Sequence, residues 1–231
     1  MKIKEILKHA CLYLQLEDVK QYLESLMQYE QAVSNLPNKE ENNETQTNEG
    51  VTQTQTTNGE EVENEETITL VAPELTTEVE ESLNFLVEIV NAVCLDIATN
   101  YVGLKHRESK TVENNELSIS SLEKPLYKII SITSNGEKVK FYLSDNLVKV
   151  QNKNIDVYYE YLPSRKTINE GVEDFNGKVS LLTLVYGIAS EYCLIKGDYE
   201  QAVMWEEKYK NNLLNNARKA RNITIRKRRW F

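Results

Sequence analysis

The amino-acid sequence predicts an α+β protein that is mainly α-helical. Apolar residues follow helical periodicity over residues 1–36, in a long stretch near the middle of the chain and in the last third. Residues 115–162 consist instead of short segments rich in β-branched and aromatic residues. The chain ends in a basic arm, residues 218–231. We therefore expect a helical bundle with a small antiparallel β meander between the long helix and a C-terminal helical hairpin, followed by an extended arm.

Charge is distributed unevenly along these parts. The formal net charge is −9, but residues 38–66 hold nine Glu and one Lys, whereas residues 218–231 hold seven Arg or Lys and no acidic residue. The rest of the chain carries −8. These shifts divide the chain into N-terminal helices (1–36), an acidic insert (37–67), a core (68–217, with the hairpin at 178–217) and the basic arm (218–231).

Two short helices are predicted within residues 1–36, with a break near Glu17 and Asp18 where the apolar face changes. Residues 37–67 contain no aromatic residue and almost no apolar one, so burial cannot offset the entropy of ordering them. We interpret this insert as mobile, with binding of a basic partner as the alternative. The apolar stripes of the two helices are Ile3, Ile6, Leu7, Ala10 and Leu14, then Val19, Leu23, Leu26 and Met27.

A long core helix follows the insert. Thr77 and Glu80 have the spacing of a capping box, in which each side chain accepts a hydrogen bond from an unpaired backbone N–H. Gly103 is the expected stop of the helix. The predicted core stripe is Val79, Leu83, Leu86, Val90, Val93, Ile97 and Tyr101.

The meander is predicted from four strand-like segments and the turns between them. Asn135-Gly136 is the strongest turn signal, because both residues tolerate the positive φ of a two-residue hairpin turn. In the last segment Val157, Tyr159 and Tyr161 alternate with more polar neighbours, so we expect this face to pack on the helices. The segments are 126–133, 137–143, 147–150 and 155–162.

The C-terminal hairpin has a predicted turn and two apolar stripes. Gly197 suits a left-handed helix end, and Asp198 with Gln201 forms the next capping box. The stripe of the first helix is Leu181, Val185, Ile188, Tyr192 and Ile195, and that of the second is Trp205, Tyr209 and Leu213.

The sequence offers little for catalysis, metal binding or cofactor binding. His9 and His106 are the only histidines, and neither has metal-ligand spacing to a cysteine or to the other. We place His106 at a solvated helix end, where it interacts with the helix dipole. Cys11, Cys94 and Cys193 lie in apolar helical patterns and are interpreted as buried structural thiols. We expect no catalytic residue, no cofactor, no metal and no enzymatic activity.

Membrane insertion is not expected either. No run of about 18 apolar residues is present. The first residues, Met1-Lys2-Ile3-Lys4-Glu5, lack the apolar region of a signal peptide. The sequence therefore predicts a soluble protein made in a cytoplasm.

The basic arm is the candidate functional segment, and it has three interpretations. It is a solvated tail, it binds nucleic-acid phosphates, or its Arg side chains and terminal aromatics dock on another protein. Apolar residues alternate with the basic residues of the arm, and Trp230-Phe231 are its last two residues. Large aromatic side chains are costly to leave in water and are typical interface anchors, so this pattern favours docking on another protein. The predicted partner-binding residues are Arg221, Ile223, Ile225, Arg226, Lys227, Arg228, Arg229, Trp230 and Phe231.

Four motifs, in their order along the chain, carry a family resemblance. They resemble the head-to-tail connector (adaptor) proteins of tailed bacteriophages, including the neck ring proteins of crAss-like phages. The resemblance covers roughly residues 77–231, and the acidic insert sets this chain apart from shorter members. The motifs are Tyr159-Glu160-Tyr161-Leu162-Pro163, Tyr186-Gly187-Ile188-Ala189-Ser190-Glu191-Tyr192-Cys193, Ala202-Val203-Met204-Trp205-Glu206-Glu207-Lys208-Tyr209 and the terminal Arg228-Arg229-Trp230.

The resemblance implies a structural virion protein located in the phage neck and made in the host cytoplasm. It implies a ring of twelve copies that joins the portal to the tail or to further neck ring proteins and continues the DNA ejection channel. The implied partners are further copies of the chain, the portal protein and tail proteins, with transient contact to genomic DNA left open. The alternative hypothesis is a DNA-binding or packaging accessory protein that uses the basic arm.

Deleting residues 40–66 tests the interpretation of the insert. We expect the melting temperature to change by less than about 2 °C, because the segment holds no predicted core residue and contributes little to the free energy of unfolding. Differential scanning calorimetry of the full chain and the deletion variant measures this. A drop of many degrees would contradict the interpretation.

Overall fold

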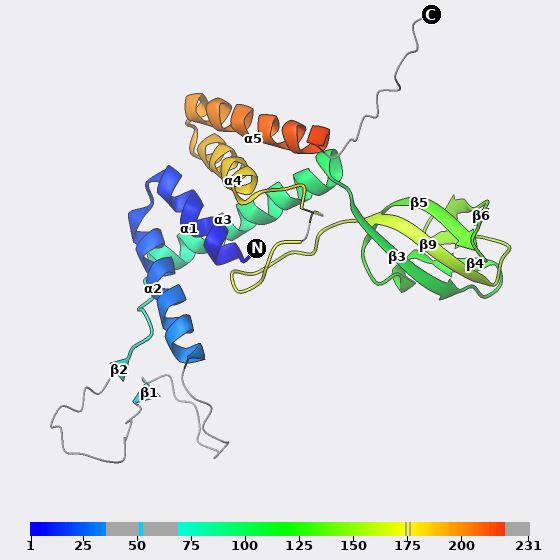
Figure 1. The fold of residues 1–231 in the computed structure, drawn as a ribbon, viewed down its shortest axis with the longest axis horizontal. Helices are drawn as coiled ribbons and strands as arrows, with labels where there is room; N and C mark the ends of the chain where they lie inside the picture. Colours follow the sequence, from blue (N-terminus) through cyan, green and yellow to red (C-terminus); the bar gives the residue numbers. More distant parts are fainter. Residues whose placement is uncertain (36–50, 53–68, 174, 176, 220–231) are drawn as a thin grey trace, which may run out of the picture.

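The computed structural model describes residues 1–35, 51–52, 69–173, 175 and 177–219 (Figure 1). The predicted class, α+β and mainly α, is confirmed. Most of the acidic insert and the arm beyond Lys219 lie outside the described residues. The one described part of the insert is β1 (Val51–Thr52), which pairs with β2 (Thr69–Leu70).

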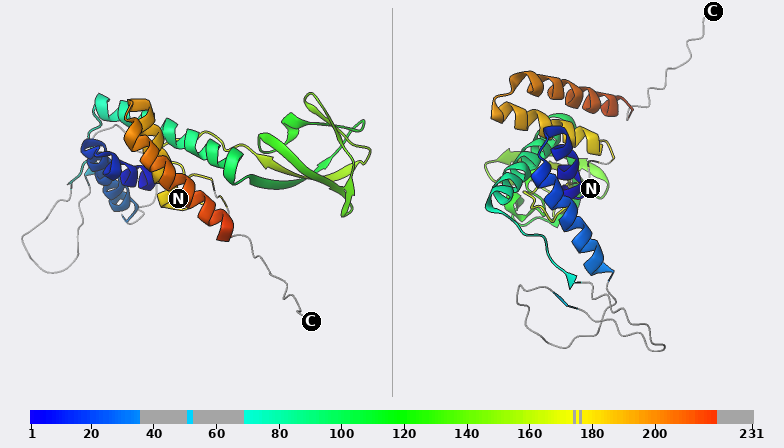
Figure 2. Two further views of the ribbon diagram at one scale, coloured as in Figure 1. Left: turned by 90° about the horizontal axis from the view of Figure 1, so that it is seen from above. Right: turned by 90° about the vertical axis from the view of Figure 1, so that its left-hand side faces the viewer.

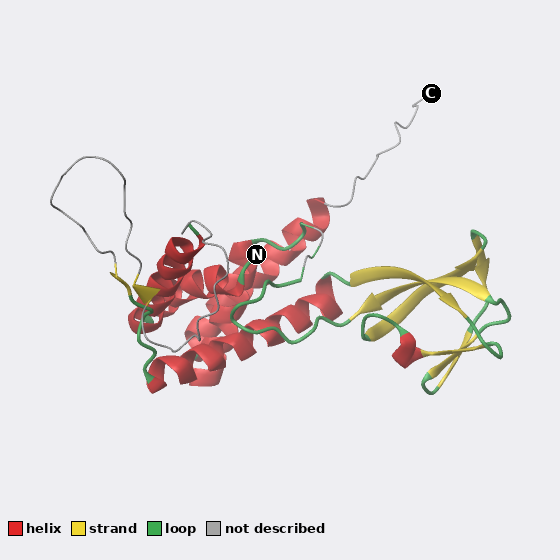
Figure 3. Cartoon of the chain, turned by 90° about the horizontal axis from the view of Figure 1, so that it is seen from below, coloured by secondary structure: helices red, strands yellow, loops and turns green. Residues whose placement is uncertain are grey.

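The described chain forms a helical unit and a β unit at opposite ends of an elongated molecule (Figures 1 and 2). Figure 3 shows the segregation of helices from strands. The helical unit consists of α1 (Ile3–Leu14), α2 (Glu17–Ser34), α3 (Thr77–Asp96), the π-helical turn η1 (Ile97–Tyr101), α4 (Leu181–Lys196) and α5 (Tyr199–Lys219). The β unit consists of β3 (Leu104–Thr111), β4 (Glu116–Ser118), the 3-10 turn η2 (Ile119–Ser121), β5 (Leu126–Ser134), β6 (Glu137–Val139), β7 (Tyr142–Ser144), β8 (Leu147–Lys149) and β9 (Asn154–Tyr161).

The two N-terminal helices share the core of the helical unit with α3 and α4. The break lies slightly before the predicted one, because Gln15 takes the left-handed conformation that ends α1 and α2 begins at Glu17. Most of the first predicted stripe is fully buried, and in the second Val19 and Leu23 are buried while Leu26 and Met27 are half-buried. The helices α1 and α2 thus contribute residues to the main core.

The long helix α3 begins and ends differently from the prediction. Its cap is Thr76, not Thr77: the Thr76 Oγ1 accepts a hydrogen bond from the backbone N–H of Val79 at 3.4 Å. At its other end α3 continues into the π-helical turn η1, which ends the helix. There the Val102 backbone N–H donates a hydrogen bond to Ile97 O at 2.8 Å. Gly103 is not in the left-handed region, so the predicted glycine stop is wrong.

The core stripe of α3 is largely as predicted. Leu83, Leu86, Val90, Val93 and Ile97 are buried, whereas the two ends of the stripe are half-buried or exposed. By length and composition, residues 77–101 are the one described helical segment that is able to cross a membrane, and half of its most apolar window is buried inside this fold. This burial is what the core helix of a globular unit requires.

The β unit consists of two small antiparallel sheets and has its own core, so the prediction of a single meander is wrong in detail. The strand orders are β3-β9-β5-β6 and β4-β8-β7. The predicted strand 137–143 is split into β6 and β7, which belong to different sheets. The Asn135-Gly136 turn is confirmed, with φ of 53° and 85°. The eight-residue strand β3 was not predicted, because polar residues outnumber apolar ones in it.

The strand β9 is central in its sheet and does not pack on the helices as predicted. Val157 and Tyr159 are fully buried, but inside the core of the β unit. Tyr161 packs against both this core and that of the helical unit. The face predicted to meet the helices is therefore covered by the second sheet, except at its last residue.

The α4–α5 hairpin follows the prediction closely. Gly197 ends α4 with φ of 84°, and the Asp198 Oδ1 accepts a hydrogen bond from Gln201 N at 3.2 Å. Trp205, Tyr209 and Leu213 are buried as predicted. In the first stripe Val185 and Ile188 are buried and Leu181 and Tyr192 half-buried, but Ile195 is 57% exposed because it lies on the outer side of α4. The helix α5 continues to Lys219, so Arg218 and Lys219 are helical and not part of an extended arm.

Close packing at Gly187 brings α3, α4 and α5 together. A Cβ atom at this position would lie 2.8 Å from Val93 Cγ1 and 3.0 Å from Tyr209 Cε2. Val93 and Tyr209 are themselves buried, so neither side chain is free to move aside. The three helices depend on the absence of a side chain here.

Replacing Gly187 with Ala tests this packing constraint. Helix propensity alone predicts that Ala stabilises by roughly 0.5–1 kcal/mol, whereas overpacking costs about 1–3 kcal/mol. We expect a net loss of stability, measured as a lower urea midpoint at unchanged slope. The matched control is Ile195→Ala on the exposed side of the same helix and outside the pocket lining, which we expect to leave the midpoint nearly unchanged. A stabilised Gly187→Ala variant would contradict the packing argument.

Candidate functional site

His106 lies in a polar cluster at the β unit, not at the solvated helix end that we predicted. It is on β3, where its ring lies edge-on to Tyr159, with ring centroids 5.8 Å apart. Its Nε2 atom is buried and lies 3.3 Å from the Oε2 atom of Glu123, without hydrogen-bond geometry. The prediction failed because the helix ends before β3 begins.

Glu108 is the most connected group of this cluster. Its carboxylate accepts hydrogen bonds from the Tyr159 hydroxyl at 2.7 Å and from Glu123 N at 3.1 Å, and it pairs with Lys110 at 2.8 Å. Partial burial alone raises the pKa of Glu108, but these donors and the ammonium outweigh burial and lower its pKa below the usual value. The cluster therefore ties β3 to β9 and to the segment before β5. The three contacts of the Glu108 carboxylate thus hold separate segments of the β unit together.

The three cysteines are buried and free, as predicted. Burial raises the pKa of Cys11 and of Cys94 to about 12, and raises the pKa of Cys193 as well. A thiol with such a pKa remains protonated at neutral pH and is a poor nucleophile and metal ligand. Within the described residues, no group of three His, Cys, Asp or Glu side chains is placed to hold a metal ion.

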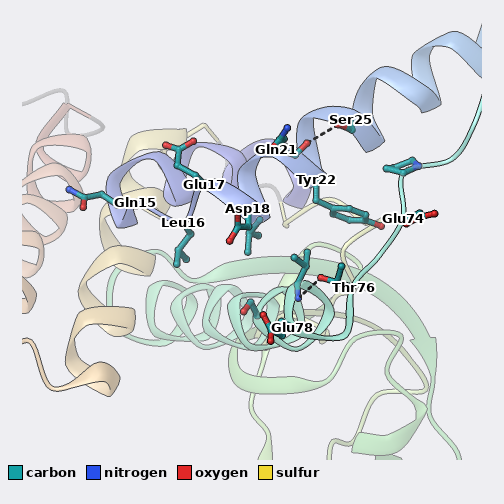
Figure 4. A pocket seen from close by; sticks show the side chains of 14 residues that line it. Gln15, Leu16, Glu17, Asp18, Gln21, Tyr22, Ser25, Glu74, Thr76 and Glu78 are labelled. Atoms are coloured by element: carbon teal, nitrogen blue, oxygen red, sulfur yellow. Dashed lines mark hydrogen bonds between the residues drawn. The ribbon is translucent and has the colours of Figure 1, made fainter.

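Figure 4 shows a pocket between α2 and the N-terminal end of α3, with a volume of about 540 Å³. Its wall contains hydrogen bonds internal to each helix, among them Ser25 Oγ donating to Gln21 O at 2.9 Å. Four acidic side chains line it, and no Lys, Arg, His or Cys is among its described lining residues. Acidic residues at helix N-termini interact favourably with the helix dipole, which accounts for several of them. The acidic side chains are Glu17, Asp18, Glu74 and Glu78.

A groove between the end of α3, α4 and α5 is the best candidate site among the described residues. Its volume is about 350 Å³, at the lower end of the roughly 300–1,000 Å³ typical of ligand pockets. Its apolar walls are exposed: Leu194 on α4 by 48%, and Tyr199 and Val203 on α5 by 67% and 55%. We call it the hairpin groove and define it by Asp96, Tyr101, Gly187, Glu191, Leu194, Tyr199, Val203, Glu206, Tyr209 and Lys210.

The base of the hairpin groove is held by a partly buried polar contact. The Tyr209 hydroxyl donates to the Asp96 Oδ2 at 2.7 Å, and Asn100 Nδ2 donates to the other carboxylate oxygen at 2.8 Å. Burial first, and then this hydrogen bond to an acidic partner, raise the pKa of Tyr209 above its usual value, so the phenol stays protonated. The Asp96 carboxylate thus joins α3, η1 and α5.

The rim of the hairpin groove is acidic. Glu206 pairs with Lys210 one turn later, whereas Glu191 has no ion-pair partner among the described residues. Acidic groups beside exposed apolar walls suit a ligand with positive charges and an apolar end.

The sequence-predicted binding residues are not in this groove. All nine, from Arg221 to Phe231, lie outside the described residues. Sequence reasoning missed Leu194, Tyr199 and Val203, which are exposed. A signal was present, because Tyr199, Val203 and Leu214 recur at helical spacing beside the buried stripe of α5 and give that helix a second apolar face. A scan against models of known protein families and a search of curated proteins find no match for this chain.

Changing Glu108 to Gln tests the polar cluster of the β unit through pH. A carboxyl whose pKa is lowered by folding contributes stability that is present above its unfolded pKa, about 4.3, and is lost as the pH falls toward the folded value. We expect the urea midpoint of the wild-type chain to fall more steeply below about pH 5 than that of the variant. Glu137→Gln, at an exposed carboxylate on β6, is the control and should follow the wild type. Parallel curves for all three proteins would refute the role of Glu108.

Proposed function

We propose that this chain is a structural virion protein, one subunit of a ring in the neck of a tailed bacteriophage that joins the portal to the tail and continues the DNA channel. The observation that carries the proposal is the order of elements: α3, then the β unit, then the α4–α5 hairpin, then a basic arm with an aromatic end. This order and the four motifs resemble head-to-tail connector proteins. The role proposed is assembly and not catalysis.

Exposed apolar side chains on several elements support an assembly role. They occur on α1, on β7 and on α5, for example Leu12 at 52%, Tyr142 at 72% and Tyr199 at 67% exposure. Soluble monomers rarely leave large apolar patches uncovered, and a subunit in a closed ring covers two different surfaces by heterologous contacts. An elongated subunit with separate exposed surfaces is compatible with such packing (Figure 2).

The charge distribution is compatible with a channel through which DNA passes. Residues 67–103 hold six acidic residues and no Lys or Arg. An acidic wall repels phosphates, so it does not retain the passing DNA. The positive charge is concentrated instead in residues 218–231.

This concentration of positive charge also favours the alternative, a DNA-binding or packaging accessory protein. The two functions differ in salt dependence and in location. Affinity for DNA that falls steeply with salt and disappears with the arm, while ring assembly is unaffected, would favour the alternative. Cryo-electron microscopy of the virion that places this chain on the capsid shell or on tail fibres would exclude the neck proposal.

Deleting Arg226 to Phe231 tests the role of the arm in assembly. We expect the variant to fold normally, because every described core residue precedes it, and to fail to dock on its partner in the neck. Circular dichroism checks the fold, and electron microscopy of the chain co-expressed with the portal and tail proteins of the same virus checks docking. Replacing the same residues' four charges by Gln while keeping Trp230 and Phe231 is the matched control that separates charge from aromatic anchoring. An unchanged assembly with the deletion variant would contradict the proposal for the arm.

A further inference from the structure

We infer that the hairpin groove receives the end of the basic arm, Arg226 to Phe231, of a second copy of this chain. The inference rests on the proposed function in one respect, since a ring subunit must contact further copies of itself. It names the partner of the arm and the surface that the arm occupies.

The apolar walls of the hairpin groove match the aromatic end of the arm. Leu194, Tyr199 and Val203 are about half exposed or more, and all three line the hairpin groove. A Trp or Phe side chain placed between them covers this surface and loses its own contact with water. Each buried aromatic removes roughly 150–250 Å² from solvent, which makes it a strong anchor.

The charges of the groove and of the arm are complementary. Asp96, Glu191 and Glu206 contribute three carboxylates, and Lys210 is the one basic residue that lines the groove among the described residues. The last six residues hold Arg226, Lys227, Arg228 and Arg229 directly before the aromatic pair. Glu191 is free to accept an Arg fork, because no described cation pairs with it.

The length and course of the chain favour a second copy over the same copy. The arm leaves α5 at Lys219, the end of the helix far from Tyr199 (Figure 1). Twelve extended residues span up to about 40 Å, enough to cross to a neighbouring subunit. To fill its own groove the chain would have to turn back along α5, and residues 220–231 contain no Gly or Pro and only Asn222 among the residues that favour a turn.

Photo-crosslinking of the full chain tests the inference directly. A benzophenone amino acid replaces Trp230, and isotopically labelled and unlabelled copies are mixed before irradiation. We expect crosslinks between a labelled and an unlabelled copy, mapped by mass spectrometry to the peptide around Leu194 and Tyr199. Crosslinks within one copy, or to another surface, overturn the inference.

Two neighbouring residues of α4 give a matched pair of variants. Leu194 lines the groove, whereas Ile195 is similarly exposed and does not. We expect Leu194→Glu to weaken self-association at least about tenfold and Ile195→Glu to leave it unchanged, as measured by sedimentation velocity. Equal effects of the two variants overturn the inference. Circular dichroism confirms that each variant is folded.

A charge exchange tests the contact without depending on packing. Glu191→Arg and Arg228→Glu should each weaken self-association, and the double variant should recover part of the loss because the ion pair is restored with reversed sign. Losses that simply add in the double variant overturn this pairing.

These measurements separate the inference from the proposed function. Rings that form while the Trp230 position never crosslinks to the hairpin groove overturn the inference and leave the ring proposal standing. Open or two-copy assemblies that carry the crosslink support the inference and overturn the ring.

Discussion

The close approach of three helices at Gly187 is the constraint on which the rest of the helical unit depends. With a hydrogen atom in place of a side chain, α4 lies against Val93 of α3 and the ring of Tyr209 on α5. This contact sets how deeply the hairpin sits on the long helix, because protein interiors have no spare volume to absorb a shift. The N-terminal helices then complete the same core, and α1 packs on α4 from the other side.

The same contact explains why a groove exists. Gly187 provides no side chain for the floor, and Tyr209 turns its hydroxyl toward Asp96 and not toward solvent. The walls are formed by Leu194, Tyr199 and Val203, whose side chains remain about half exposed or more in the described chain. The packing at Gly187 that stabilises the monomer thus also leaves the hairpin groove open to a partner. A rigid fold can support assembly in this way.

The β unit has a core of its own and few links to the helical unit. Its two small sheets enclose a core of their own, and the described link to the helical unit runs through the continuation of η1 into β3 and through Tyr161, which packs on both cores. Polar contacts around Glu108 join β3, at the edge of its sheet, to the central strand β9. A unit joined through so few contacts can present its outer face to a neighbour independently of the helices.

Local sequence determined those features whose cause is local. Helical periodicity, the Gly197 end of α4, the Asn135-Gly136 turn and the buried line of Trp205, Tyr209 and Leu213 follow from spacing, backbone preference and hydrophobicity, which act within a few residues. The charge of the arm and its aromatic end likewise follow directly from the sequence.

Tertiary structure decided what depends on distant residues. Strand β3 forms because β9 pairs with it along its whole length, although its own residues are mostly polar. His106 lies half-buried beside Tyr159 for the same reason. The hairpin groove exists only where α3 meets α4 and α5, and no single helix contains it, because a surface between elements is defined by their packing and not by the pattern of any one of them.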